Sequence, residues 1–402
     1  MSKHGLTSTL SRAILLSVIH LVFFLCYTIS NIANGAIIDM QPTVVDIFAG
    51  AGGLSSGLHM AGWDVVAAVE NDRWCVETHR ANFPSTWVID GDVRNVDFTQ
   101  FSGVDLIAGG PPCQPFSVAG KQLACDDPRD MIPQFIRAIQ EARPKAFLME
   151  NVAGLYSNRH RHILISARER LQSLGYSVDA TPLDAAMYGV PQRRERVFLV
   201  GVPKGKRFRF PQRSHGPRAA DPYATVSQAL AAAPADEPNR AKVTFAKSPI
   251  LRPSPYAGML VNGAGRPMNL FAPSPTIPAS AGGNRTHIVD EDGVLLDYHR
   301  YLLGGGEPRT GEVEGVRRLT LRESAAIQSF PPDYIFCGPR SRQYSQVGNA
   351  VPPLLAKAVC AAIRSALFPI YEKNSQEESD FYLQLAARRA EYATAGRQPH
   401  CE

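Results

Sequence analysis

Short apolar runs that each end at a polar or glycine residue recur along the first half of the chain. They are Thr43 to Phe48, Val65 to Val69, Trp87 to Ile89, Val104 to Ala108 and Ala146 to Met149. Such runs, separated by segments of helical character, predict strands that alternate with helices in an α/β fold. Because ligands of open parallel sheets bind beyond the carboxyl ends of the strands, the residues that end these runs should converge on one crevice.

Two more apolar runs and two helices are predicted further along the chain. The runs are Tyr176 to Val178 and Arg196 to Gly201. Thr320 followed by Glu323 is typical of a helix N-cap with a capping box, and Pro331 supplies a stop for that helix. A last helix is expected from about Pro353 to Leu367.

Changes in composition and hydrophobic pattern divide the chain into five parts. Between 203 and 315 proline and glycine are dense and no long hydrophobic period is visible, which predicts a small, loop-rich domain. A larger domain is expected over 43–202, and the chain should return to it over 316–370. The ends are an apolar extension at 1–39 and a charged tail at 371–402.

Composition and charge fit a globular protein with an anionic partner. Of the 402 residues, 45% are hydrophobic and 20% are charged, so disorder is not expected. The net charge is +5, and the segment from Lys204 to Arg218 carries six Lys or Arg and no acidic residue. This basic segment is either a solvated face or a phosphate-binding surface. The seven scattered cysteines include no C-x-x-C pair, which argues against a disulfide framework and a zinc site and favours a reducing compartment.

One cysteine is set apart from the others by its surroundings. Cys113 lies in the stretch Gly109-Gly110-Pro111-Pro112-Cys113-Gln114-Pro115-Phe116-Ser117, directly after a predicted strand. The two prolines fix the backbone and remove two amide donors, so the chain aims the thiol, which is predicted to be a nucleophile. A proline-rich turn with a buried, inert cysteine is the alternative.

Several blocks of sequence together resemble the cytosine-C5 DNA methyltransferases, the family of bacterial type II restriction-modification methylases and their solitary relatives. They are the Pro-Cys stretch, Asp46 to Gly57, Gln192 to Arg196 and Gln346 to Pro353, which follow the family's order. The resemblance implies a Rossmann-like class I methyltransferase domain with a mixed, mostly parallel sheet and a small, loop-rich target recognition domain. It also places the last two predicted strands as an antiparallel edge.

The resemblance further implies S-adenosyl-L-methionine as cofactor and assigns residues to its pocket. They are Phe48, Gly50, Gly52, Gly53, Glu70, Asp92, Pro111 and Asn349. Phe48 would lie against the adenine, and the glycine loop would approach the methionine part. Glu70 would bind the ribose hydroxyls and Asp92 would bond near the adenine amino group. Asn349 would complete the pocket from the far end of the chain.

The family's mechanism assigns four catalytic residues to this chain, Cys113, Glu150, Arg194 and Arg196. The Cys113 thiolate would add to C6 of cytosine, which makes C5 nucleophilic. Addition places charge on N3 and O2, so a proton donor at the Watson-Crick edge lowers the barrier. Glu150 fits that role with a pKa raised by burial. Arg194 and Arg196 would contact O2 of the target and nearby phosphates.

The resemblance assigns DNA contacts to five further residues, Gln114, Ser117, Arg129, Gln192 and Thr276. Strand alternation predicts that Gln192, Arg194 and Arg196 point to one face, although a charged edge strand would show the same pattern. Because a duplex hides C6 of cytosine, the base has to be flipped out, and the small domain is expected to read the sequence. The expected partners are double-stranded DNA and a separately acting restriction endonuclease, with a monomeric enzyme and no metal.

The first 39 residues conflict with a DNA-modifying enzyme of the cytoplasm. Lys3 and Arg12 precede the apolar run Ala13 to Cys26, which is the layout of a secretory signal or a short membrane anchor. Met40 stands just before the first predicted strand. We therefore expect translation to start at Met40 and the enzyme to be cytoplasmic and nucleoid-associated, with a genuine anchor as the alternative.

Two other functions stay open at this level. An RNA cytosine-C5 methyltransferase would share the fold, but the Cys-Phe-Thr tripeptide of the tRNA-acting branch is missing from the sequence. A catalytically silent nucleic-acid-binding or membrane-tethered protein is disfavoured by the presence of Cys113, Glu150 and Arg196. The favoured prediction is methylation of cytosine C5 in a specific short duplex sequence, through a covalent bond between cysteine and C6 and with base flipping.

Overall fold

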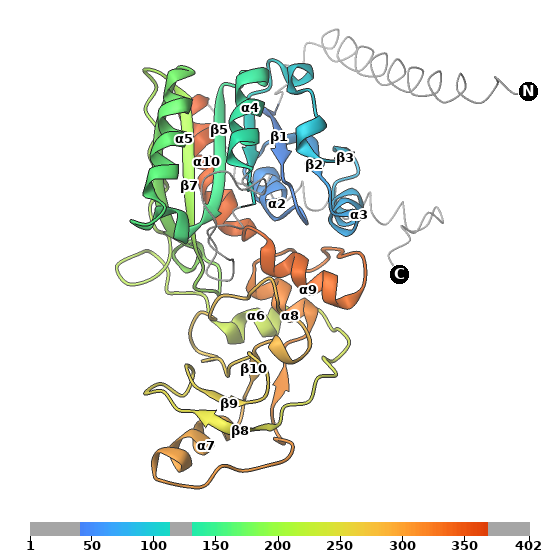
Figure 1. Ribbon diagram of the computed structural model, residues 1–402, viewed down its shortest axis with the longest axis vertical. Helices are drawn as coiled ribbons and strands as arrows, with labels where there is room; N and C mark the ends of the chain where they lie inside the picture. Colours follow the sequence, from blue (N-terminus) through green and yellow to red (C-terminus); the bar gives the residue numbers. More distant parts are fainter. Residues whose placement is uncertain (1–40, 113–130, 369–402) are drawn as a thin grey trace, which may run out of the picture. The chain divides into compact units, whose positions relative to one another are not determined.

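A seven-stranded sheet forms the centre of the part of the chain that the computed structural model describes, residues 41–112 and 131–368 (Figure 1). The strands are β1 Thr43–Ile47, β2 Asp64–Glu70, β3 Trp87–Asp90, β4 Leu106–Gly109, β5 Ala146–Val152, β6 Tyr176–Asp184 and β7 Glu195–Pro203. The expectations about the apolar extension, the start at Met40 and the charged tail fall outside the described residues.

The strand order in the sheet is β3-β2-β1-β4-β5-β7-β6. The first five strands run parallel, while β7 is antiparallel to both β5 and β6. This arrangement confirms the predicted mixed, mostly parallel sheet with an antiparallel edge. The order reverses between β1 and β4, and in such sheets the crevice outside that point is where ligands bind.

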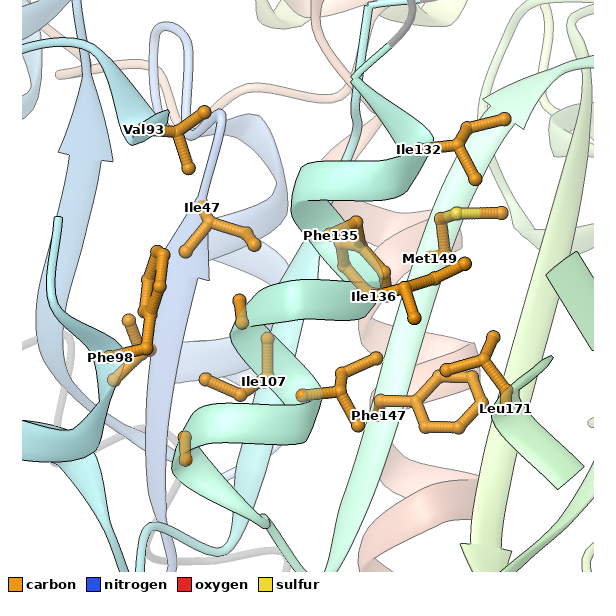
Figure 2. Packing of buried hydrophobic residues seen from close by; sticks show 14 of the residues in the cluster. Ile47, Val93, Phe98, Ile107, Ile132, Phe135, Ile136, Phe147, Met149 and Leu171 are labelled. Carbon is orange, nitrogen blue, oxygen red and sulfur yellow. The ribbon is translucent and has the colours of Figure 1, made fainter. Parts of the chain in front are cut away.

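Helices cover both faces of the sheet. Those around it are α2 Gly53–Met60, α3 Arg73–Asn82, α4 Ile132–Ala142, α5 Arg161–Ser173 and α10 Pro353–Leu367. On one face Phe135 and Ile136 of α4 pack over Ile107 and Phe147 of the strands (Figure 2). On the other face α2 and α10 share an apolar cluster with the sheet. A Cβ on Gly57 would lie 2.3 Å from the Ala356 side chain, so this glycine lets α2 and α10 approach closely.

The remaining α-helices and strands belong to the second half of the chain, whereas four of the five 3-10 helices in the described residues lie in the first half. These α-helices and strands are α6 Val226–Ala232, β8 Phe245–Ile250, β9 Met259–Val261, β10 Ile288–Val289, α7 Val294–Leu303, β11 Arg317–Arg318, α8 Leu321–Ile327 and α9 Arg340–Asn349. The 3-10 helices are Val93–Asn95, Phe98–Phe101, Ala153–Tyr156, Ala185–Tyr188 and Gly283–Arg285. Two short antiparallel pairs are present, β8 with β9 and β10 with β11, and all of these strands except β11 lie in the region predicted to be loop-rich.

The predicted boundaries of the small domain stay a prediction. The strand β11 lies just beyond residue 315, yet it pairs with β10 inside the predicted small domain. On the other side, Val226 and Ala229 of α6 share an apolar cluster with Leu321 of α8 and with Ala51. The chain therefore packs continuously across both proposed limits.

Local signals set several element ends as predicted. The side chain of Thr320 accepts from the backbone N–H of Glu323, whose carboxylate accepts from the N–H of Thr320, so the capping box of α8 is complete. The last helix, α10, spans Pro353–Leu367 as expected. One cysteine differs from expectation, because Cys337 is disulfide-bonded.

Within the described residues, one stretch has the length and mean hydropathy of a membrane span, Arg340–Leu367. It contains α9 and α10, which are separated by a break at Pro352. Its apolar side chains, such as Leu355 and Ile363, are fully buried against the sheet. This is the pattern of core helices.

Candidate active site

The loop from Phe48 to Gly53 joins β1 to α2 at the carboxyl edge of the sheet. Phe48, Gly50 and Gly52 all have left-handed backbone conformations, with φ of 60°, 55° and 78°. For Phe48 this conformation costs about 1–2 kcal/mol, and such strain clusters at functional sites. A Cβ on Gly52 would lie 2.5 Å from Phe83, whereas a Cβ on Gly50 would meet nothing within 4 Å. The loop is therefore packed against Phe83 at Gly52 and is open at Gly50.

Glu70, at the end of β2, holds this loop in place. One carboxylate oxygen accepts from the N–H of Gly50 at 2.8 Å, and the other accepts from Asn71 at 2.9 Å and Asp72 at 2.8 Å. Burial raises the pKa of Glu70, while these backbone hydrogen bonds oppose the rise. Each carboxylate oxygen has more than one acceptor site, so Glu70 can also accept from a ligand hydroxyl.

Asp92 follows β3 and begins a 3-10 helix. Its carboxylate accepts from the backbone N–H of Arg94 at 2.9 Å and forms an ion pair with the Arg94 guanidinium. These hydrogen bonds lower the pKa of Asp92. A Cβ on the preceding Gly91 would meet nothing within 4 Å, so the backbone beside Asp92 is open.

Asn349 ends α9 and is exposed, next to a segment that reaches the glycine loop. A Cβ on Gly53 would lie 2.4 Å from the carbonyl oxygen of Val351 and 3.0 Å from the side chain of Ala350. The structure thus brings this distant part of the chain against the loop, as the resemblance implies.

A buried polar chain, which the sequence analysis missed, lies beneath the loop. The hydroxyl of Ser55 donates to Asp46 at 2.6 Å and lies 3.0 Å from Nε2 of His79. All three side chains are fully buried, and the second oxygen of Asp46 has no hydrogen-bond partner among the described residues. Burial raises the pKa of Asp46 to about 7 and lowers that of His79 to about 3. The sequence signal for this buried chain is Asp46 itself, an acidic residue among the apolar residues of β1.

Replacement of Asp46 by Asn is expected to remove a pH dependence of stability. The pKa of Asp46 is about 7 in the folded state against an ordinary 3.8, so the folded state keeps a proton that the unfolded chain releases. The bound proton stabilises the folded state. This stabilisation is complete below the pKa of Asp46 in the unfolded chain and is lost as pH rises towards 7, by at most about 1.4 kcal/mol per pH unit. Urea unfolding of wild type and variant at a series of pH values measures the difference, and parallel curves would contradict the prediction.

Glu150 and Arg196 form an ion pair on neighbouring strands. Glu150 lies on β5 and Arg196 on β7, where Arg196 is paired with Val152. The Arg196 Nε lies 2.9 Å from a carboxylate oxygen of Glu150, and the two side chains are 15% and 11% exposed. Burial raises the pKa of Glu150, while the charges of Arg196 and Arg194 oppose the rise. Glu150 is therefore a buried acid that can hold a proton and is oriented by a cation.

The start of the Pro-Cys stretch lies beside this acid. A Cβ on Gly110 would be 3.0 Å from a carboxylate oxygen of Glu150. The Asn151 side chain donates to the carbonyl of Pro111 at 3.1 Å and accepts from the N–H of Val152 at 2.8 Å. Asn151, which was not singled out from the sequence, fixes the backbone two residues before Cys113. The described residues end there, so Cys113, Gln114, Ser117 and Arg129 lie outside them.

Gln192 and Arg194 are buried in the segment that leads into β7. Both precede β7 rather than lying on it, and they are 0% and 1% exposed. Gln192 bonds to Gln328 and to the N–H of Ile277. Arg194 donates to the carbonyls of Ile277 and Gly348, at 3.1 Å and 2.7 Å. Arg193 and Glu195 are exposed, so burial alternates along this segment as the strand period predicts. The expected contacts of Gln192 and Arg194 with DNA and the target base stay a prediction.

Thr276 directly precedes Ile277, to which Gln192 and Arg194 are hydrogen-bonded. It is exposed, and its hydroxyl donates to the carbonyl of Arg193 at 2.7 Å. The backbone N–H of Arg193 donates to Ser274, and the N–H of Ser274 donates to Pro191. The segment predicted to be the core of the recognition domain thus lies beside the residues that lead into β7.

The sheet topology, the glycine loop after β1 and the acid at the end of β2 define a Rossmann-like methyltransferase. The chain belongs to the C-5 cytosine-specific DNA methylase family, whose model matches residues 42–256 and 266–365. It is thus a DNA cytosine-5 methyltransferase, and this match favours DNA over the RNA alternative.

Individual relatives support the same family. The chain is 33% identical over 371 residues to the Type II methyltransferase M1.HphI of Haemophilus parahaemolyticus, covering 87% of this chain and 94% of the relative. It is 36% identical over 334 residues to M.NgoMIV of Neisseria gonorrhoeae, covering 82% and 99%.

Solved structures of low identity share the fold. A mutant of DNMT2 from Spodoptera frugiperda matches with a TM-score of 0.60 and 18% identity, over 80% of this chain and 100% of that chain. The S. pombe Dnmt2 methyltransferase matches with a TM-score of 0.58 and 16% identity, over 83% and 100%. At such identities the likeness supports the fold alone.

Proposed function

We propose that this enzyme methylates C5 of cytosine in one short duplex sequence, with S-adenosyl-L-methionine as donor, as the modification enzyme of a restriction-modification system. The observation that carries the proposal is the buried pair of Glu150 and Arg196 beside Gly110, at the entry to the Pro-Cys stretch. The relatives named Type II methyltransferases support the biological setting.

The loop after β1 fits the proposed cofactor. Gly50 and Gly91 face open space on either side of Glu70, and Val351 lies against Gly53 from the far end of the chain. Phe48, Glu70 and Asp92 would bind the adenosine part, and Gly50 to Gly53 the methionine part, with Pro111 and Asn349 at the rim. Bound S-adenosyl-L-methionine supplies an electrophilic methyl group at this edge of the sheet.

The chain's own residues would activate the cytosine ring. The Cys113 thiolate adds to C6 and forms a carbon-sulfur bond, while Glu150 donates its proton to N3. Arg196 orients the Glu150 carboxyl through the ion pair. C5 becomes nucleophilic and takes the methyl group. Loss of the C5 proton to water, elimination of the Cys113 thiolate and return of the N3 proton to the Glu150 carboxylate then restore the aromatic ring and the free enzyme.

The DNA substrate would be held by both parts of the chain. Base flipping exposes C6 and the Watson-Crick edge, and the region around Thr276 would read neighbouring bases. Exposed cations between Lys204 and Arg218 offer partners for phosphates. We expect a monomeric, cytoplasmic enzyme associated with the nucleoid, which requires no metal, with a cognate endonuclease as a separate protein.

Bisulfite sequencing tests this function directly. Plasmid DNA from a methylation-free host that expresses the chain, from Met1 and in parallel from Met40, should contain protected cytosines in one short sequence context. The same plasmid from a host without the gene is the control. Absence of protected cytosines from both forms, with soluble protein present, would refute the proposed activity.

A further inference from the structure

Three buried polar side chains, Gln192, Arg194 and Gln328, form a cluster that we call the polar hub. They are 0%, 1% and 0% exposed. Gln192 and Arg194 come from the loop before β7, and Gln328 is the C-cap of α8. The Gln192 amide donates to the Gln328 side-chain oxygen at 2.6 Å, which joins the two segments directly.

The polar hub holds one backbone position of the small domain by both of its polar groups. The side-chain oxygen of Gln192 accepts from the N–H of Ile277 at 2.9 Å. The carbonyl of Ile277 accepts from the Arg194 guanidinium at 3.1 Å. Ile277 directly follows Thr276, so these contacts fix the position of the segment proposed to read DNA.

The same side chains hold the segment that reaches the cofactor loop. The Gln328 amide donates to the carbonyl of Val347 at 2.6 Å, and Arg194 donates to that of Gly348 at 2.7 Å. A Cβ on Gly348 would lie 2.2 Å from the carbonyl oxygen of Pro278, so the two segments are flush. Three residues further on, Val351 packs against Gly53 of the glycine loop.

The polar hub also lies close to the proposed acid. Arg194 and Arg196 flank Glu195, and the charges of both arginines act on Glu150. The hub is therefore hydrogen-bonded to Ile277, beside the segment proposed to read DNA, and to Val347 and Gly348, in the segment that reaches the glycine loop. The charge of its Arg194 also acts on Glu150.

We propose that the polar hub is a positioning device that couples DNA binding by the small domain to cofactor binding at the glycine loop. This inference rests on the proposed function. A duplex that restrains Thr276 and Ile277 restrains the hub, and through Gly348 it restrains the segment that closes the cofactor loop. A buried network in which each side chain makes at least two hydrogen bonds favours one arrangement over others, so each ligand would find the site of the other already ordered.

The test measures reciprocal binding rather than turnover alone. The dissociation constant of an unmethylated duplex that carries the recognition sequence, as identified by bisulfite sequencing, is determined with and without saturating S-adenosyl-L-homocysteine. Wild type should bind the duplex at least about 5-fold more tightly with this probe, and Gln328→Met should reduce the ratio to below about 2-fold. The double variant Gln192→Met with Gln328→Met leaves no side-chain amide unpaired, although the N–H of Ile277 and the carbonyl of Val347 each lose a partner. It should lower the ratio in the same way, and it is the second variant to use if the single variant is poorly soluble.

Gln343→Leu is the matched control. Gln343 also donates two hydrogen bonds to backbone carbonyls, of Phe336 and Gly338, but it contacts none of the hub residues. It should keep the wild-type ratio even if its stability falls. The coupling would be refuted if the two dissociation constants of wild type were equal, or if the folded hub variants kept the wild-type ratio of these constants. In either case plasmid methylation by wild type would still support the proposed function. Loss of plasmid methylation by wild type would instead overturn the proposed function.

Discussion

Replacement of Cys113 by alanine is expected to abolish methyl transfer, by about 10⁴-fold or more, while duplex binding is retained. Without the thiolate there is no addition to C6, and C5 of cytosine is too weak a nucleophile to react at a useful rate. The backbone before Cys113 is held by Asn151 through Pro111 and does not depend on the thiol. The loss should therefore appear in kcat and leave the affinity for DNA close to that of wild type.

A duplex that contains 5-fluorocytosine at the target position provides the measurement. With S-adenosyl-L-methionine present, the methyl group is transferred to C5, but fluorine cannot then leave as a proton does. Wild type should therefore be trapped as a covalent adduct that survives denaturing electrophoresis. Cys113→Ala should form no adduct. Cys360→Ala is the control, because burial raises the pKa of the Cys360 thiol and keeps it unreactive in the core. An adduct formed by Cys113→Ala would assign the nucleophile to another residue.

Replacement of Glu150 by Gln is expected to lower kcat by about 10²–10⁴-fold, the usual contribution of a general acid. Glutamine keeps the shape of the side chain but has no acidic proton for N3. The contact with Arg196 can persist through the amide oxygen, so folding and DNA affinity should change little. Single-turnover rates of methyl transfer measure the loss. The control is Glu141→Gln, which alters another ion-paired glutamate, bound to Arg137 on α4.

The pH profile adds a second readout for Glu150. Because burial raises its pKa, the protonated acid persists to higher pH than in an exposed glutamate, and the rate should fall as pH rises through that pKa. This fall should be missing from Glu150→Gln. A variant that retains both the wild-type rate and the wild-type profile would exclude Glu150 as the acid.

Much of the fold could be predicted because its signals are local. The apolar run that ends at Glu70 is β2, and the turn that follows β1 contains the glycines expected there. The capping box at Thr320 and the proline at Pro353 each mark the start of a helix. Such signals depend on neighbours in sequence, which are visible without the structure.

The parts that could not be predicted depend on distant partners. The period of a strand predicts that Gln192 and Arg194 share a face, and both are buried, but it does not reveal what they contact. The partners that bury Gln192 are Ile277 and Gln328, far along the chain. Asp46 shows the same limit, because its bond to Ser55 depends on how α2 packs on β1.

The contact between Val351 and Gly53 has a consequence for synthesis of the enzyme. The cofactor loop is among the first parts to leave the ribosome, yet the segment that closes it, followed by α10, emerges near the end of translation. A nascent or truncated chain without α10 would expose the apolar face that Leu54 and Leu58 present to that helix. Such a chain would be a target for quality control before it could modify DNA, so only complete products would contribute to protection of the genome.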